Sequence, residues 1–523
     1  MRKIFMIAAV ACGALQAQAD LVLTPGDPEP SIRWMNKDIA GSLKPRVSRV
    51  LLATPNGDLT ESQSAGREHA EPRPGELILQ QVYNWGTFNT IAKEKKGAIE
   101  FTVTIHNNAT TLAGVELDVL SLKLPQKPTG WEWPHLSTNI DEPGIIFADC
   151  GDLKVACCND DTLRPLRLGF GTALDADKKT WQIEVDTGRR KNAPPFYPFI
   201  DRPVFPQKWD SFKFYLRFGG KDATRTSLAG DVLEKYRKAF PYELKWPDRR
   251  PIGALMIASS ETTSESNPRG WLQDKTIDTR TPEGRAKLKE RLLKYADGAV
   301  AEMKKTNAQG MILWDPEGQE FPHAISYIGD PRWLPPESDA VMDEFFKKFT
   351  DAGLKVGVCI RPQMPVKPAY GGSVFQMDMR DVEGVMKAKI EAAKKRWGCT
   401  LFYVDSNIED DARGRVVHAA QIYRNLAKAF PDILLIPEHE YARHYAYTAP
   451  YNEVRGKHFS TPQDIRELYP EAFSVLYVAD GPVEENKAAL TEAVKRGDIL
   501  LFRGWYDDPL NEKVREIYKA AGK

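Results

Sequence analysis

A repeated unit in the second half of the chain constrains its fold more than any other feature. From about residue 251 onward, amphipathic segments that stop at a Gly or Pro alternate with short, almost wholly apolar strands. Strands this apolar are buried on both faces, which is typical of a parallel sheet covered by helices. Four copies of the unit are clear, with strands at 311–315, 355–361, 400–405 and 433–438.

Further strands bring the count to that of a closed barrel. Apolar segments at 254–259, 473–480 and 498–504 raise the number of strands to seven, and a weaker one near 444–449 makes eight. A (β/α)8 TIM barrel usually needs ~250 residues, and the segment 251–523 matches this. An open, doubly wound sheet is the alternative, but no G-x-G-x-x-G motif or P-loop follows any strand. The sequence therefore predicts a C-terminal (β/α)8 catalytic barrel.

The N-terminal half has a different rhythm. Short runs rich in Val, Ile, Thr, Tyr and Phe recur between turn residues, and several alternate apolar with polar side chains. This alternation predicts antiparallel strands with one face in water, and hence a β-sandwich over 20–226. A helix near 227–240 and a turn-rich stretch at 246–251 predict a helical linker at 227–250. The expected strands lie at 47–53, 77–85, 98–106, 115–124, 144–148, 181–185 and 212–218.

The first residues predict export. Arg2 and Lys3 precede an apolar run at 4–15, and Ala17-Gln18-Ala19 gives the small-x-small pattern that signal peptidase cleaves. A signal peptide at 1–19 would leave a mature chain that begins at Asp20 and is periplasmic or secreted. Acylation of Cys12 in a lipoprotein is the alternative, although Ala9 stands where such a signal prefers Leu.

Composition excludes several classes of partner. Lys plus Arg and Asp plus Glu number 72 each, whereas a nucleic-acid-binding surface needs a basic excess. No stretch of about 18 apolar residues exists beyond the leader, so we expect no membrane insertion of the mature chain.

Cysteine and histidine spacing gives little support for a metal or a cofactor. Export permits a disulfide between Cys150 and either Cys157 or Cys158. No CxxC pair occurs, and His439 and His444 lack the i, i+4 spacing of an HExxH zinc site. We therefore expect neither a metal nor a cofactor.

The predicted active site lies where the barrel strands end. In (β/α)8 barrels the reaction takes place at the carboxyl ends of the strands, and carboxylates dominate there. Glycosidic bond cleavage needs two carboxyl groups, one ionised and one with a raised pKa. Asp405 ends a strand of Phe, Tyr and Val with no local need for a charge, so we expect it to be catalytic, with Glu438 on the next strand as acid/base. We expect substrate contacts from Asp315, Glu317, Arg361, Asn407 and Arg503.

Three short motifs, at 310–315, 349–358 and 402–407, resemble segments of the α-galactosidase and α-glucosidase clan of barrel glycosidases. The segment 310–315 is similar to the strand that carries a sugar-binding aspartate in that clan, and 349–358 is similar to its helix, glycine and strand step. Residues 402–407 (FYVDSN) are similar to its fourth strand, which implies that Asp405 is the nucleophile. The clan's acid/base aspartate ends the sixth strand, where this chain has only Glu453. The resemblance also implies an N-terminal β-sandwich.

The sequence thus predicts an exported, retaining glycoside hydrolase acting on an oligosaccharide or glycan. Arg361 and Arg503 at strand ends leave open a second function, because paired guanidinium groups can clamp a substrate carboxylate. That alternative is a sialidase-like or uronic-acid-releasing hydrolase on the same barrel. A carbohydrate-binding protein that has lost its catalytic pair is a third.

Overall fold

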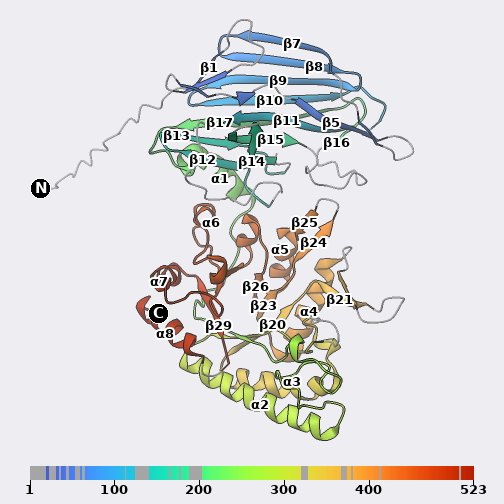
Figure 1. Cartoon of the computed structure of the whole chain (residues 1–523), viewed down its shortest axis with the longest axis vertical. Coiled ribbons are helices and arrows are strands. Elements are labelled where there is room, and N and C mark those ends of the chain that lie inside the picture. The colour runs from blue at the N-terminus through green and yellow to red at the C-terminus, as the bar shows by residue number, and fades with distance from the viewer. Residues whose placement is uncertain are drawn as a thin grey trace, which may run out of the picture. The chain divides into compact units, whose positions relative to one another are not determined.

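A computed structural model of the whole chain provides the fold, which Figure 1 shows. The predicted signal peptide lies outside the described residues except for Ala19, and so does Cys12. The chain divides into two compact units, 1–239 and 240–523. The structure describes residues 19–22, 31–34, 37–39, 41–42, 46–53, 59–61, 65–111, 113–123, 141–163, 167–175, 178–187, 203–319, 328–366, 374–377, 381–411, 414–505 and 508–523.

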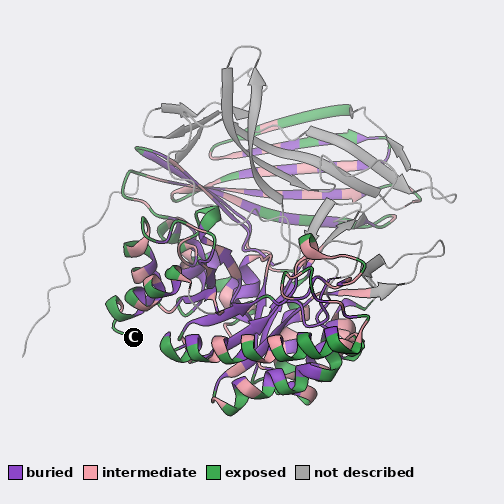
Figure 2. Cartoon of the chain, turned by 60° about the horizontal axis from the view of Figure 1, so that its bottom comes forward, coloured by how far each residue is buried: buried purple, intermediate pink, exposed green. Residues whose placement is uncertain are grey.

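The first unit is the antiparallel β-sandwich that the sequence predicts. One sheet has the order β12-β13-β17-β10-β9-β8-β7, a second has β14-β15-β11-β5-β6 with β4 and β16 also paired to β11, and β1-β2-β3 form a small third sheet. Along β10, Ile99, Phe101, Val103 and Ile105 are buried and alternate with partly exposed residues. Figure 2 shows this alternation along the described strands.

The strands of this unit have the following bounds: β1 Ala19–Val22, β2 Ser31–Trp34, β3 Lys37–Ile39, β4 Gly41–Ser42, β5 Arg46–Ala53, β6 Leu59–Glu61, β7 Ala65–Arg73, β8 Glu76–Tyr83, β9 Gly86–Lys95, β10 Ala98–Asn107, β11 Ala113–Lys123, β12 Ile145–Cys150, β13 Leu153–Cys158, β14 Arg167–Asp175, β15 Lys178–Thr187, β16 Pro203–Val204 and β17 Trp209–Gly219.

The segment expected as a linker is shared between the two units. Helix α1 (Arg225–Ala239) packs on the β-unit, where Arg217 on β17 donates to the Asp231 carboxylate at 2.8 Å and to the Leu228 carbonyl at 2.7 Å. Residues 240–250 belong to the second unit, where the Trp246 indole donates to Gln309 Oε1 at 3.1 Å.

The disulfide considered for Cys150 is absent, which corrects that expectation. Cys150, Cys157 and Cys158 are all buried free thiols. The register of the β12–β13 hairpin explains why, because Cys150 lies opposite Leu153 while Cys157 lies opposite Ile146. Cys150 and Cys157 are therefore about four residues apart along the strand direction, or ~13 Å, far beyond the reach of a disulfide.

The second unit is the (β/α)8 barrel that the sequence predicts. Its strands pair in parallel in the order β26-β23-β20-β19-β18-β29-β28-β27. The Ala449 amide, just before β27, donates to the Leu435 carbonyl of β26 at 3.0 Å and joins the two ends of the sheet. The barrel strands are β18 Ile252–Leu255, β19 Gly310–Leu313, β20 Lys355–Ile360, β23 Leu401–Val404, β26 Leu434–Pro437, β27 Tyr451–Glu453, β28 Val475–Tyr477 and β29 Ile499–Arg503.

The sixth strand lies later in the chain than predicted. The segment expected as a strand at 444–449 contains most of a 3₁₀ helix, η3 (Ala442–Ala446), and the strand is β27. The buried His444 ring accounts for the turn, because its Nδ1 accepts from the Tyr441 amide at 3.0 Å while Nε2 lies 2.9 Å from the His418 carbonyl. A side chain that closes its own backbone turn competes with strand pairing.

Helices surround the barrel and complete its core. The outward-facing strand residues pack against the helices, and the inward-facing ones fill the barrel interior together with Trp246. The remaining elements are α2 Pro282–Lys305, α3 Pro336–Asp351, α4 Val382–Trp397, α5 Ala420–Ala429, α6 Gln463–Leu468, α7 Lys487–Lys495, α8 Pro509–Ala520, η1 Ser260–Thr262, η2 Pro331–Trp333, η4 Val454–Gly456 and the hairpins β21 Gln363–Val366 with β22 Val374–Met377 and β24 Ile408–Asp411 with β25 Gly414–Val417. None of the described helices is long and apolar enough to cross a membrane.

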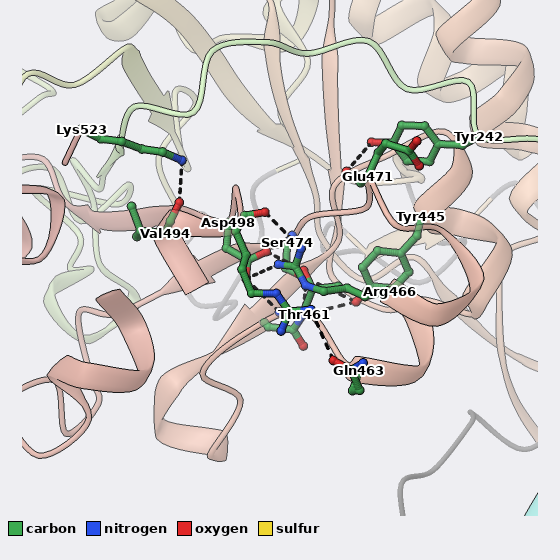
Figure 3. Close-up of polar contacts among 12 residues, drawn as sticks. Tyr242, Tyr445, Thr461, Gln463, Arg466, Glu471, Ser474, Val494, Asp498 and Lys523 are labelled. Atoms are coloured by element: carbon green, nitrogen blue, oxygen red, sulfur yellow. Dashed lines mark hydrogen bonds and ion pairs between the residues drawn. The ribbon is translucent and has the colours of Figure 1, made fainter. Parts of the chain in front are cut away.

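A buried ion pair lies at the amino-terminal end of β28 and β29 (Figure 3). The Asp498 carboxylate, which is fully buried, accepts from Arg466 at 2.9 Å. It also accepts from the Ser474 amide at 2.9 Å and from the Thr461 hydroxyl and amide. Because this end of a (β/α)8 barrel serves stability and not catalysis, we assign the network to folding.

Removal of Asp498 should destabilise the barrel strongly. Asp498→Ala leaves Arg466, whose side chain is 5% exposed, without its buried counter-charge, which costs about 3–5 kcal/mol. Asp351→Ala is the control, because its pair with Lys347 is mostly exposed and contributes less than about 1 kcal/mol. Urea unfolding followed by circular dichroism measures both. Equal effects of the two substitutions would refute the assignment.

Candidate active site

Side chains along each barrel strand point alternately inward and outward, and this places a set of charged side chains at the carboxyl ends of the strands, which we call the barrel mouth. Cys359, Tyr403, Ile436 and Leu501 lie in the interior cluster, and Tyr451 packs against it. Side chains two residues further along each strand face the same way and therefore also point inward. These second residues are Arg361, Asp405, Glu438, Arg503 and Glu453.

An aromatic layer lies directly beneath these charged groups. The Trp314 and Tyr403 rings have their centroids 4.7 Å apart, Tyr403 and Tyr451 5.1 Å, and Tyr451 and Tyr477 5.9 Å. These rings come from β23, β27 and β28 and from the residue after β19. A low-dielectric floor of this kind strengthens electrostatic interactions above it and offers apolar faces to a sugar ring.

Asp405 is held in place by its neighbours. Arg361 donates to Asp405 Oδ2 twice, from Nε at 3.0 Å and from Nη2 at 2.8 Å, and the Ser406 hydroxyl donates to Oδ1 at 2.8 Å. Only 7% of Asp405 is exposed. A guanidinium at this distance favours the ionised carboxylate, so the arrangement fits a carboxylate nucleophile.

Glu438 has the opposite electrostatic character. Burial, the negative charge of Asp405 and a hydrogen bond between the two carboxyl groups raise the pKa of Glu438 to about 7, while the Ser406 amide and Arg361 act in the lowering direction. The Ser406 amide donates to Glu438 Oε2 at 2.8 Å. Two neighbouring acids with such different environments can divide the ionised and the protonated role between them.

Ser406 connects both acids through a constrained backbone. Its φ is +51°, in the left-handed region that few residues other than glycine adopt. This conformation lets the hydroxyl reach Asp405 while the amide reaches Glu438. Constrained backbone of this kind is concentrated at functional sites, and no sequence pattern around Ser406 indicates it.

Asn407 was predicted to bind substrate, but the structure buries it fully and pairs its amide with backbone. Its Nδ2 donates to the His439 carbonyl at 2.7 Å and its Oδ1 accepts from the His439 amide at 2.8 Å. These two bonds tie the end of β23 to the end of β26. Asn407 therefore positions Glu438, the residue before His439.

Asp315 and Glu317, both predicted as substrate contacts, are buried behind β19. The two Asp315 oxygens accept from the Ile257 and Ala258 amides at 3.0 Å each, and burial raises the pKa of Asp315 to about 7. Glu317 Oε1 accepts from the Ile328 and Gly329 amides. Among the described residues, Glu317 Oε2 is buried without a hydrogen-bond partner, so both acids serve the backbone around the end of β19 and neither presents an accessible oxygen to a substrate.

Lys389 is a site residue that the sequence patterns did not predict. Its buried Nζ donates to the carbonyls of Ile328, Arg361 and Gln363 at 3.0, 2.7 and 2.6 Å, and burial lowers the pKa of Lys389 to about 8. Lys389 thus fixes the backbone at Arg361 and Gln363 and joins it to the neighbouring segment at Ile328. One sequence feature could have indicated its burial: Lys389 lies between Met386 and Ala393 on the apolar face of α4.

Arg503 and Glu453 are the charged residues that β29 and β27 contribute to the barrel mouth. Arg503 pairs with Asp480 at 2.5 Å and with Asp508 at 3.3 Å. Glu453 accepts from the Tyr451 hydroxyl at 2.8 Å and from two nitrogens of Arg455, and the hydrogen bonds from Arg455 and Tyr451 outweigh burial to lower the pKa of Glu453. Glu453 is therefore held as a carboxylate.

No group of three or more His, Cys, Asp or Glu side chains placed to hold a metal ion occurs in the described ranges. His444, one of the two histidines weighed as ligands, uses both ring nitrogens within the fold. The ring of His444 therefore serves the η3 turn and its contact with the His418 backbone.

Comparison with known proteins supports the fold. No protein-family model and no curated protein matches the chain. The α-N-acetylgalactosaminidase of Bifidobacterium bifidum, solved with GalNAc, has a TM-score of 0.52 at 10% identity over 94% of this chain and 90% of that chain. A GH36 α-galactosidase of Geobacillus stearothermophilus has a TM-score of 0.41 at 12% identity over 91% and 74%. The first likeness spans nearly all of both chains and confirms the sandwich-plus-barrel fold that the resemblance implied.

The raised pKa of Glu438 predicts a pH-dependent stability. A carboxyl group whose pKa is higher in the folded than in the unfolded chain binds more protons when folded, so the free energy of unfolding falls as pH rises from 4.5 to about 7. Glu438→Gln removes this contribution to the pH dependence of the free energy of unfolding. The raised pKa of Asp315 makes a similar contribution, but it is present in the unmodified chain and in the variant alike. We expect the fall between these pH values to be steeper in the unmodified chain, measured by urea unfolding. Parallel pH profiles would contradict the assignment.

Proposed function

We propose that this chain is an exported glycoside hydrolase that cleaves O-glycosidic bonds of an oligosaccharide or glycan with retention of configuration. The observation that carries the proposal is the pair of unlike acids at the mouth of a (β/α)8 barrel. Asp405 is held by Arg361, and the pKa of its neighbour Glu438 is raised to about 7. Export rests on the signal-like residues 1–19.

Asp405 is the proposed nucleophile. It ends an apolar strand, and Arg361 and Ser406 fix both of its oxygens. A short, rigidly held carboxylate is suited to attack an anomeric carbon and form a covalent glycosyl-enzyme. Arg361 lowers the cost of keeping that carboxylate ionised, and Lys389 holds Arg361's backbone.

Glu438 is the proposed acid/base. A group whose pKa lies near neutrality can donate a proton to the leaving oxygen and later accept one from water. In a retaining pair the two carboxyl groups lie about 5–5.5 Å apart, so the proposed mechanism requires Glu438 and Asp405 to stand at that separation when the substrate is bound. Glu453, at the end of the sixth strand, is held ionised by Arg455 and is better suited to accept a substrate hydroxyl.

The pairing of the two arginines favours a neutral sugar over a sialic or uronic acid. Arg361 directs its donors to Asp405, and Arg503 directs its donors to Asp480 and Asp508. A bidentate clamp for a substrate carboxylate would require these same donors. The structural neighbour from B. bifidum, solved with the neutral sugar GalNAc, is consistent with this substrate class.

Two isosteric substitutions test the mechanism. Asp405→Asn removes the nucleophile's charge and should lower kcat on the order of 10³-fold or more. Glu438→Gln should lower kcat sharply on a natural glycoside but spare an activated aryl glycoside, whose leaving group needs no proton. Both are measured on a panel of aryl α- and β-glycosides, an aryl sialoside and the matching natural substrates.

Glu453→Gln is the matched control for the acid/base assignment. It also replaces a carboxyl group at a strand end, and it should slow natural and activated substrates alike. If Glu453→Gln and not Glu438→Gln spares activated substrates, the acid/base role moves to the sixth strand. A fully active Asp405→Asn enzyme would remove the proposed nucleophile, and an inactive unmodified chain would favour a binding protein.

A further inference from the structure

The β-unit presents an ordered surface on the outer side of its first sheet. Antiparallel register aligns Val82, Thr87, His106 and Trp209 in one row across β8, β9, β10 and β17. The next row across the same strands contains Gln80, Asn89, Thr104 and Ser211. Residues directly opposite each other in such pairs share a face, so we call these eight side chains the sheet platform.

The first row of the sheet platform contains an exposed tryptophan that stacks on a histidine. Trp209 is 61% exposed although it is a large apolar residue, and its ring stacks on His106 with centroids 4.0 Å apart and planes 22° from parallel. Val82, at the other end of the row, is 37% exposed. The residues between these positions along the strands are buried, so the row belongs to the solvent side of the sheet.

The second row offers hydrogen-bonding groups without charge. It consists of two side-chain amides and two hydroxyls, with Gln80 Nε2 donating to Asn89 Oδ1 at 3.0 Å and the Thr104 and Ser211 hydroxyls 3.5 Å apart. An amide or hydroxyl can donate and accept at the same time. A sugar hydroxyl can also donate and accept at the same time, so it can pair with these groups. The Trp209 ring in the neighbouring row offers an apolar face on which a pyranose ring can stack.

The platform is distinct from the rest of the sheet in charge. Its eight residues include no carboxylate, ammonium or guanidinium group, although Arg67 lies opposite Val82 on the neighbouring β7. Charged groups begin in the next row on the same face, where Lys213 follows Ser211 and pairs with Glu100 at 3.8 Å, and one row further Lys93 pairs with Glu76 at 3.9 Å. An uncharged area between charged ones favours a neutral ligand.

The turn that presents Trp209 is rigidly built. The Gln207 amide donates to the Asn107 carbonyl at 2.9 Å, and its Nε2 donates to the Asn108 carbonyl at 2.8 Å. The buried Asn107 side chain donates to the carbonyls of Thr111 and Val204 at 2.8 Å each. A pre-organised aromatic side chain loses little entropy when it binds a ligand.

We propose that the sheet platform is a second carbohydrate-binding site, separate from the barrel mouth, that takes a neutral polysaccharide chain. Trp209 stacks on a sugar ring while the amide and hydroxyl row binds its hydroxyls. The choice of a saccharide as ligand rests on the proposed function, whereas the location and the neutral character rest on the platform itself. The site would hold the enzyme on a polymeric substrate.

Affinity electrophoresis of the full chain tests this proposal. The parent carries Asp405→Asn so that no polymer is degraded, and the gels contain galactomannan, xyloglucan, dextran or, as an acidic polymer, polygalacturonate. We expect at least one neutral polymer to retard the parent. Trp209→Ala should weaken that binding by about tenfold or more, as for a central anchoring residue. Trp333→Ala is the control, because Trp333 is a tryptophan of the barrel unit that is 56% exposed, and this substitution should leave binding unchanged.

A second variant guards against misfolding. Asn89→Asp keeps the acceptor for Gln80 and the side-chain size but adds a charge, so it should also weaken binding while the melting temperature stays unchanged. The proposal fails if no neutral polymer retards the parent, if both platform variants bind as the parent does, or if polygalacturonate binds best. If retention depends on Trp209 but the unmodified chain, with Asp405 intact, hydrolyses none of the glycosides in the activity panel, the platform is upheld and the proposed function is refuted.

Discussion

Closure of eight parallel strands into a barrel is the constraint on which the rest of the second unit depends. Because side chains alternate along each strand, an inward-facing residue such as Tyr403 commits Asp405, two positions later, to the barrel mouth. The same rule directs Arg361 on β20 and Glu438 on β26 to one place. Residues that are far apart in sequence thus meet without any need for long loops.

Burial at that mouth then determines the chemistry. Two carboxyl groups in contact above an aromatic layer cannot both be ionised at low cost. The Arg361 guanidinium and the Ser406 hydroxyl both contact Asp405. Glu438 accepts from the Ser406 amide, lies 3.5 Å from His439 Nε2 and feels Arg361 only at longer range, so the proton belongs on Glu438. The difference in pKa that acid/base catalysis needs follows from which acid the arginine contacts.

Sequence patterns were sufficient to predict the fold and to place Arg361, Asp405 and Glu438 at the ends of barrel strands, because strand ends and the alternation of side chains along a strand are local properties. They could not predict where donors point. Asn407 follows the same strand as Asp405, but its amide binds the backbone of His439, and only the spacing of β23 and β26 in three dimensions determines that. Likewise, the position of β27 depended on His444 closing a turn with His418 and Tyr441, a contact that no periodicity reveals.

The central claim is that Asp405 attacks the sugar, and a covalent intermediate is its most direct consequence. The chain should be incubated with a fluorinated glycosyl fluoride, which slows the second step more than the first, then quenched in acid, digested and examined by peptide mass spectrometry. The account predicts a single glycosylated peptide that contains Asp405, with fragmentation placing the sugar on that carboxylate. A sugar on Glu438 or Glu453, or turnover without any labelled peptide, would contradict it.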